Sequence, residues 1–261
     1  MAVALLAACG PGAATGPALE GRTGPATAAP GSPTGPEALT GELVVLAAAS
    51  LTEATAALVD RFTAEHPGVT VTTGFGGSSS LAAQLVAGAP ADVFVAASAE
   101  TMAPVTEAFG GTARVVARNV LELVVPAGNP GGVTGLADLA DPELAVALCA
   151  PGVPCGAAAA TLLASAGVTA APDTLERDVS AVLAKVRLGE VDAGLVYATD
   201  VRRGGDAVEG VPVPGAEDVV NDYPALVLPG AANPAAAEAF VALLLSDEGR
   251  RVLRDAGFRP R

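Results

Sequence analysis

Two strand–turn–helix units follow one another between residues 43 and 98, and each places a serine where its helix is expected to begin. In the first unit, the apolar run 43–47 predicts a buried strand. Ser50 and Glu53 follow it at the capping-box spacing, with the serine at the N-cap and the glutamate at N3. A strand–helix–strand–helix order is typical of a parallel sheet with helices on both faces, so the chain is predicted to have an α/β fold.

The second unit combines a glycine-rich turn, a short helix and a strand. Gly74, Gly76 and Gly77 permit close backbone approach, and residues 78–86 carry apolar side chains at helical spacing. Ser78 therefore falls at or next to a helix N-terminus, where backbone N–H groups without intrahelical acceptors favour an anion. The alternative is that Ser78 only caps its helix.

Further strands and helices alternate to the end of the chain. Tyr197 stands at the carboxyl end of one predicted strand, which is the end at which open α/β sheets bind ligands. Pro126, Asn129 and Pro130 follow another strand, and we place a domain crossing there. Strands are expected over residues 69–73, 119–125, 144–148, 192–197 and 221–228, and helices over 99–109, 152–166, 178–189, 233–245 and 247–256.

The composition limits the classes of partner. The net charge of −14 at pH 7 argues against nucleic acid and against anionic membrane surfaces. No uninterrupted apolar run approaches the roughly 20 residues of a membrane-spanning helix. The single histidine, His66, precedes Pro67 at an expected helix end, which favours an exposed surface position over a catalytic one.

The first 41 residues read as a signal segment followed by a tether. Leu6-Ala7-Ala8-Cys9 has the form of a bacterial lipobox, in which the signal peptide (residues 1–9) is cut before Cys9 and this cysteine is lipid-modified. The segment lacks a basic n-region, and the alternative is an incidental cysteine. Residues 10–41 are mostly Pro, Gly, Ala and Thr, which predicts a disordered tether reaching roughly 30 Å.

Two further cysteines, Cys149 and Cys155, lie six residues apart around a short turn. In an exported protein this spacing favours a disulfide, which would stabilise the fold by roughly 2 kcal/mol. Because no histidine lies near either cysteine, a zinc site is not expected.

Four sequence blocks together resemble the periplasmic molybdate-binding proteins of ABC transporters. The resemblance runs from about Glu42 to the end, and its blocks are residues 47–54, 75–98, 153–159 and 192–200. It implies the two-lobed periplasmic binding protein (type II) fold, with two chain crossings between lobes near Asn119 and Asn221. Lobe I would comprise residues 42–122 and 225–261, and lobe II residues 123–224.

The resemblance also implies a set of neutral groups that hold the tetrahedral oxyanion. These are the hydroxyls of Ser50, Ser78 and Tyr197 and the backbone N–H groups of Cys155 and Val179. Cys155 departs from the family, which usually has alanine there, but a backbone contact tolerates the change. Preorganised N–H groups at helix N-termini can hold a dianion without a cationic side chain.

The expected function is therefore that of an extracytoplasmic solute-binding lipoprotein, anchored to the outer face of the cell membrane by lipid alone. It would be a monomer that captures molybdate, and also tungstate, and delivers it to an ABC permease, with no catalytic activity, no cofactor and no other metal. A binding protein for sulfate, phosphate or ferric ion is the rival within the same class, although iron sites need more ligands than Tyr197 and Tyr223 supply. A secreted serine hydrolase using Ser78 or Ser79 would need a general base, and G-x-S-x-G is absent. A pure interaction domain would not explain five converging donors.

Overall fold

The structure is a computed structural model that describes Gly12 and residues 38–260. Cys9, the rest of the predicted signal segment and most of the predicted tether lie outside the described residues. The strands are β1 (Thr40–Ala48), β2 (Gly68–Gly76), β3 (Val93–Val95), β4 (Arg114–Pro126), β5 (Val146–Cys149), β6 (Thr174–Glu176), β7 (Ala193–Tyr197), β8 (Val208–Val211) and β9 (Val220–Val227). The α-helices are α1 (Thr52–Glu65), α2 (Ser78–Val86), α3 (Ala99–Phe109), α4 (Pro154–Ser165), α5 (Val179–Arg187), α6 (Ala198–Gly204), α7 (Pro234–Leu245) and α8 (Asp247–Asp255).

The described strands form one mixed sheet in the order β2-β1-β3-β9-β4-β7-β5-β6, with β8 paired to β4. The predicted parallel pairing holds where helices connect the strands, between β1 and its neighbours β2 and β3 and between β5 and its neighbours β6 and β7. It fails at β9 and β4, which are antiparallel to each other and to their other neighbours. The fold is thus α/β, but its sheet is not wholly parallel.

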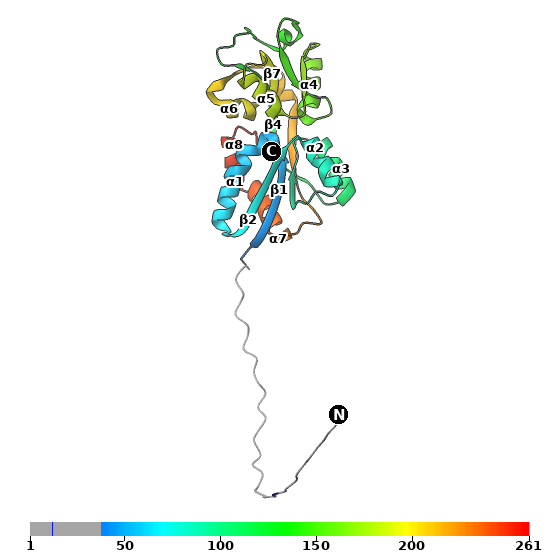
Figure 1. The fold of residues 1–261 in the computed structure, drawn as a ribbon, viewed down its shortest axis with the longest axis vertical. Helices are drawn as coiled ribbons and strands as arrows, with labels where there is room; N and C mark the ends of the chain where they lie inside the picture. Colours follow the sequence, from blue (N-terminus) through cyan, green and yellow to red (C-terminus); the bar gives the residue numbers. More distant parts are fainter. Residues whose placement is uncertain (1–11, 13–37, 261) are drawn as a thin grey trace, which may run out of the picture. The chain divides into compact units, whose positions relative to one another are not determined.

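The long strand β4 belongs to both lobes of the molecule. Its residues up to Val120 pair with β9, whereas its residues from Leu121 onward pair with β7 and β8. We call the part built on β2, β1, β3 and β9 lobe I, and the part built on β7, β8, β5 and β6 lobe II (Figure 1). Asn119 and Asn221, the two predicted crossing points, lie directly opposite each other in the β4–β9 ladder. The exact lobe limits given above, 122/123 and 224/225, stay a prediction.

Helices cover the lobe I sheet from two sides. In Figure 1, α1 lies on one side of the strands, and α2 and α3 lie together on the other. Packed against β3, the second pair buries Leu81, Leu85, Phe94, Met102 and Val105 in a small core of its own. Among residues 38–260, no helix is both long enough and apolar enough to cross a membrane.

Two predicted helix starts have the caps that the sequence indicated. The Asp178 side chain accepts from Ala181 N at 3.0 Å and opens α5, and the Asn233 side chain accepts from Ala236 N with Pro234 at the first helical position of α7. These caps satisfy N–H groups that a helix start leaves unpaired. Each cap therefore places the first turn of its helix where the local sequence predicts.

Three local predictions were wrong. The capping box at Ser50 does not form, because Ala49–Leu51 is a short 3-10 helix and α1 begins at Thr52 with Leu51 at its N-cap. The strand β1 begins at Thr40, inside the predicted tether, because parallel pairing with β2 uses backbone groups that any side chain leaves available. His66 is half-buried against Phe62, with ring centroids 4.7 Å apart, and is not fully exposed.

Candidate anion-binding site

The five predicted site residues line one small cavity between the lobes. The cavity measures about 20 Å³, and its lining also includes Gly77, Arg177 and Asp178. Lobe I contributes Ser50 and Ser78, and lobe II contributes Cys155, Val179 and Tyr197. All five are buried. The structure thus brings together residues that lie as far as 147 positions apart in the sequence, from 50 to 197.

Ser50 is held by a residue to which the sequence assigned no role. Its Oγ lies 2.8 Å from the phenolic oxygen of Tyr223 on β9, and both groups are buried. This hydrogen bond replaces the expected N-cap contact. Because a hydroxyl has one donor and two acceptor positions, Ser50 can accept from Tyr223 and still donate into the cavity.

Ser78 occupies the first position of α2, immediately after its N-cap residue Gly77. Its Oγ accepts from the backbone N–H of Ala97 at 2.9 Å. The carbonyl of Ala97 accepts in turn from the Asn221 side chain at 3.1 Å. The hydroxyl is therefore fixed as an acceptor on the side of Ala97, which leaves its own proton available to a ligand. It does not cap its helix, as the alternative reading supposed.

Tyr197 ends β7 with its side chain only 1% exposed. Within the part of the chain that the structure describes, its phenolic oxygen is buried without a hydrogen-bond partner. Burial, with the neighbouring Tyr223 and Asp200, raises the pKa of Tyr197 well above its usual value, so the group stays a neutral donor. A buried hydroxyl without a partner is costly, which indicates a missing acceptor in the cavity.

Cys155 and Val179 contribute backbone groups from helix starts. Cys155 is the second residue of α4, after Pro154, and Val179 is the first residue of α5. The N–H groups in a first helical turn have no intrahelical acceptor and carry partial positive charge. Two helix N-termini of lobe II and one of lobe I, that of α2, therefore meet at the cavity. The residues that line the cavity therefore carry hydroxyl and amide groups that can donate hydrogen bonds.

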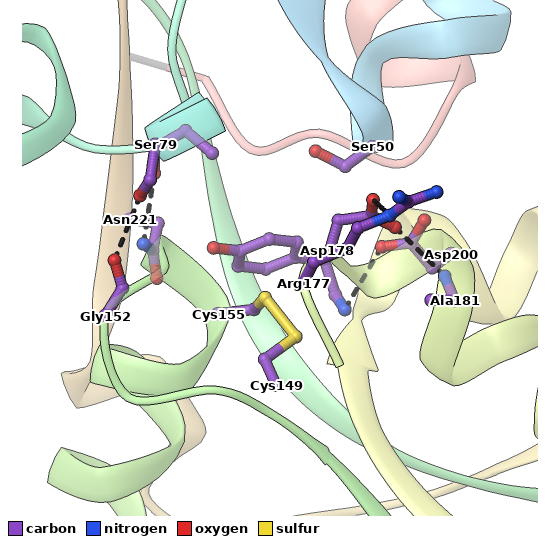
Figure 2. The surroundings of a disulfide bond; sticks show 12 residues. Ser50, Ser79, Cys149, Gly152, Cys155, Arg177, Asp178, Ala181, Asp200 and Asn221 are labelled. Atoms are coloured by element: carbon purple, nitrogen blue, oxygen red, sulfur yellow. Dashed lines mark hydrogen bonds and ion pairs between the residues drawn. A yellow bond between two sulfur atoms is a disulfide. The ribbon is translucent and has the colours of Figure 1, made fainter. Parts of the chain in front are cut away.

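Cys155 is also joined to Cys149, at the end of β5, by the predicted disulfide. The Cα atoms are 5.7 Å apart, and both cysteines are buried beside the cavity (Figure 2). The bond ties the first turn of α4 to the adjacent strand. It therefore restrains the backbone of Cys155, which lines the cavity.

We expect the exported protein to contain this disulfide, because the two cysteines are already at bonding distance in the fold. Under non-reducing conditions a thiol-blocking label should leave Cys149 and Cys155 unmodified, and reduction should expose both to labelling in peptide mass mapping. The Cys149→Ala/Cys155→Ala variant should lose about 2 kcal/mol of unfolding free energy. Two labelled thiols before reduction would contradict the expectation.

Two charged residues of the lining were missed by sequence reasoning. Arg177 has an 88% exposed side chain, and its Nε lies 3.7 Å from the carboxylate of Asp178. Asp178 is the N-cap of α5, and Figure 2 shows its side chain turned toward Ala181. The cavity is therefore not lined by donors alone, although its one carboxylate is engaged by its own helix. The signal that could have identified Arg177 and Asp178 is their position directly before the start of α5.

Asp200, which is buried next to Tyr197, is a further residue that sequence reasoning missed. Its carboxylate accepts from Tyr197 N at 3.3 Å and from Arg203 Nη2 at 2.7 Å. Burial raises the pKa of Asp200 to about 6, although the charge and hydrogen bond of Arg203 act in the opposite direction. The pair fixes the turn between β7 and α6, and with it the backbone of Tyr197.

Asp200 should make the protein more stable toward acid pH than its Asp200→Asn variant. Its pKa in the folded state, about 6, exceeds the usual value of 3.8, so the folded state holds this proton more tightly. The resulting stability is present below pH 4 and is lost as the pH rises through about 6. Urea unfolding from pH 4 to 7 should show the free-energy difference between wild type and variant falling over this range. A constant difference would contradict the raised pKa.

Comparison with known proteins identifies the family. A family model described as bacterial extracellular solute-binding protein matches residues 43–259. The molybdate-binding protein ModA of Mycobacterium tuberculosis is 42% identical over 229 residues, which are 87% of this chain and 88% of that protein. Among solved structures, the periplasmic molybdate-binding protein of Azotobacter vinelandii gives a TM-score of 0.72 at 21% identity, covering 84% of this chain and 99% of that one. The sulfate-binding protein SubI of M. tuberculosis gives 0.71 at 20% identity, covering 84% and 86%.

Two lobes that share strand β4, with a small cavity between them, define a protein of the two-lobed periplasmic binding class, type II. The matches to molybdate- and sulfate-binding structures are nearly equal and show this fold alone. The family match spans most of the chain, and the relative from M. tuberculosis is far above 30% identity. The chain belongs to the bacterial extracellular solute-binding protein family.

Proposed function

We propose that this protein captures molybdate, and also tungstate, between its lobes and delivers it to an ABC permease as a binding protein without catalytic activity. The observation that carries the proposal is the meeting of five uncharged donors from both lobes at one cavity. Three of these are hydroxyls, and the phenol of Tyr197 has no partner among the described residues. A fully deprotonated tetrahedral oxyanion can accept from all of them.

The choice of molybdate rests on relatives with high sequence identity. The ModA protein of M. tuberculosis shares 42% of its residues with this chain over nearly the whole of both proteins. Sulfate remains the second candidate, because SubI has the same fold. Its identity of 20% is too low to support a shared ligand.

The proposal extends to location and assembly. The protein acts outside the cytoplasm, in keeping with its family, as a monomer held to the membrane by lipid on Cys9. Since Cys9 lies outside the described residues, the lipobox sequence alone supports this anchor. Its loss in Cys9→Ala should move the protein from the membrane fraction to the soluble fraction.

A thermal-shift screen tests the ligand directly. Molybdate or tungstate at a thousandfold above its dissociation constant adds roughly 4 kcal/mol of unfolding free energy, which for a domain of this size is a rise of roughly 8–16 °C. Sulfate should give a much smaller shift, since only size distinguishes it from molybdate. Shifts that are largest with sulfate would identify a sulfate-binding protein, and no shift with any oxyanion would contradict the proposal.

Phosphate should be rejected on chemical grounds. Near neutral pH, hydrogen phosphate carries a proton that needs an acceptor, and burying it unpaired costs roughly 1–3 kcal/mol. The carboxylate of Asp178 is the one side-chain acceptor of this charge in the described lining, and it already accepts from Ala181 N. Competition calorimetry should show no displacement of molybdate by phosphate. Tight phosphate binding would mean that Asp178 leaves its helix to accept the proton.

A further inference from the structure

The two lobes touch closely at the turn that begins α2. A Cβ atom added to Gly77 would lie 2.5 Å from the backbone oxygen of Arg177 in lobe II. Such a distance is far below van der Waals contact, and the obstructing atom is backbone, so no side-chain rotation can relieve it. Gly77 has φ −61° and ψ 128°, a conformation that alanine adopts readily. The glycine is therefore required by the neighbouring lobe and not by its own backbone conformation.

A second contact lies two residues further along, at Ser79 in the first turn of α2. The Ser79 hydroxyl donates to the carbonyl of Gly152 at 3.0 Å, across the space between α2 and the chain that precedes α4 (Figure 2). Gly77 and Ser79 stand on either side of Ser78, the residue whose hydroxyl faces the cavity. The lobes thus meet on both sides of a proposed ligand contact.

The size of the cavity relates these contacts to binding. At about 20 Å³ the cavity is small, and the residues around it come from both lobes. Contacts that hold the lobes together beside the cavity therefore also hold its two walls around whatever occupies it.

We propose that Gly77 determines ligand affinity, because the absence of a side chain there lets the start of α2 reach the Arg177 carbonyl and close the site around the oxyanion. The hydrogen bond from Ser79 to Gly152 secures the same closure. This inference rests on the proposed oxyanion-binding function. It assigns a role to two residues that need not touch the ligand, so both act as positioning residues.

The test compares Gly77→Ala with Gly230→Ala in the full chain. A Cβ at Gly230 would meet no atom within 4 Å, and this residue does not line the cavity, so it is a control for the loss of a glycine in lobe I. Calorimetry with molybdate, tungstate, sulfate and phosphate should show Gly77→Ala binding the preferred oxyanion about 5- to 150-fold more weakly, the range for overpacking a well-packed contact. Gly230→Ala should bind within about twofold of wild type, and Ser79→Ala should lose about two- to tenfold.

Two further measurements show whether the contact between Gly77 and Arg177 forms only when the lobes close or is present in the ligand-free protein as well. The melting temperature of ligand-free Gly77→Ala should match that of Gly230→Ala, because open lobes leave room for the added methyl group. In small-angle scattering at saturating ligand, Gly77→Ala should be less compact than wild type. Binding by Gly77→Ala as tight as wild type, or failure of this variant to fold, would overturn the inference. A wild-type protein that binds none of the four oxyanions would overturn the proposed function, and this inference with it.

Discussion

Replacing Ser78 with alanine is expected to weaken molybdate binding by roughly 1.5–3 kcal/mol, or roughly 10- to 150-fold, the scale of a hydrogen bond to a charged group. The hydroxyl accepts from Ala97 N at 2.9 Å, so its proton is available to the ligand. Alanine removes this donor. It also leaves the buried N–H of Ala97 unpaired, so the ligand-free protein should lose roughly 1–3 kcal/mol of unfolding free energy.

Ser79→Ala is the matched control, one position along the same helix. Its hydroxyl bonds to the carbonyl of Gly152 at an exposed position and does not line the cavity. The loss of an exposed, uncharged hydrogen bond should cost about 0.5–1.5 kcal/mol of binding free energy. Calorimetry on both variants shows which of the two serines contacts the ligand. A larger loss of binding free energy in Ser79→Ala would mean that the contact is made by Ser79.

Tyr197→Phe should have opposite effects on binding and on stability. Without ligand, the Tyr197 hydroxyl is buried and has no hydrogen-bond partner among the described residues, so its removal should raise the unfolding free energy by about 1 kcal/mol. With molybdate bound, the same change removes a donor to a charged oxygen and should cost roughly 1.5–3 kcal/mol of binding free energy. Urea unfolding of the ligand-free variant and calorimetry with molybdate measure the two effects separately.

Tyr223→Phe provides the control for that result. The Tyr223 hydroxyl is equally buried but is paired with Ser50 at 2.8 Å, so its removal should lower the unfolding free energy by about 1 kcal/mol. The two tyrosine-to-phenylalanine changes should therefore shift stability in opposite directions. If Tyr197→Phe also destabilises the ligand-free protein, its hydroxyl has a partner in solution and is not reserved for a ligand.

Local sequence signals predicted most elements of the fold, but they missed β6, β8, α6 and the first part of β4. The helix α3 spans the predicted residues, and α5 and α7 begin at the predicted Asp178 and Asn233 caps. These features depend on hydrophobic periodicity and on side chains that bond within a few residues, so a short window of sequence contains the cause. The predicted N-cap role of Ser50 was wrong, because its hydroxyl bonds to a partner distant in the sequence, Tyr223.

The candidate site was predicted from the sequence through a resemblance and not through geometry. Five residues named in advance line one cavity, and their role as ligand contacts stays a prediction. Local reasoning reached the helix starts at Ser78 and Val179, since glycine turns and caps mark such positions. It missed Asp178 as part of the lining, because a capping residue has the same local sequence whether or not a second lobe faces it.

By itself, the sequence determined most of the strands and helices and the serine-bearing turns, because their causes are local; the short elements β6, β8 and α6 gave no such signal. The tertiary structure alone decided which of these starts meet, and it did so through the partner change of β4 between Val120 and Leu121. That change sets lobe II against lobe I and brings the Arg177 carbonyl to Gly77 and the Gly152 carbonyl to Ser79. No residue near Gly77 in the chain requires a glycine there with φ −61°. The requirement comes from a backbone atom 100 residues away, which only the folded chain brings into contact.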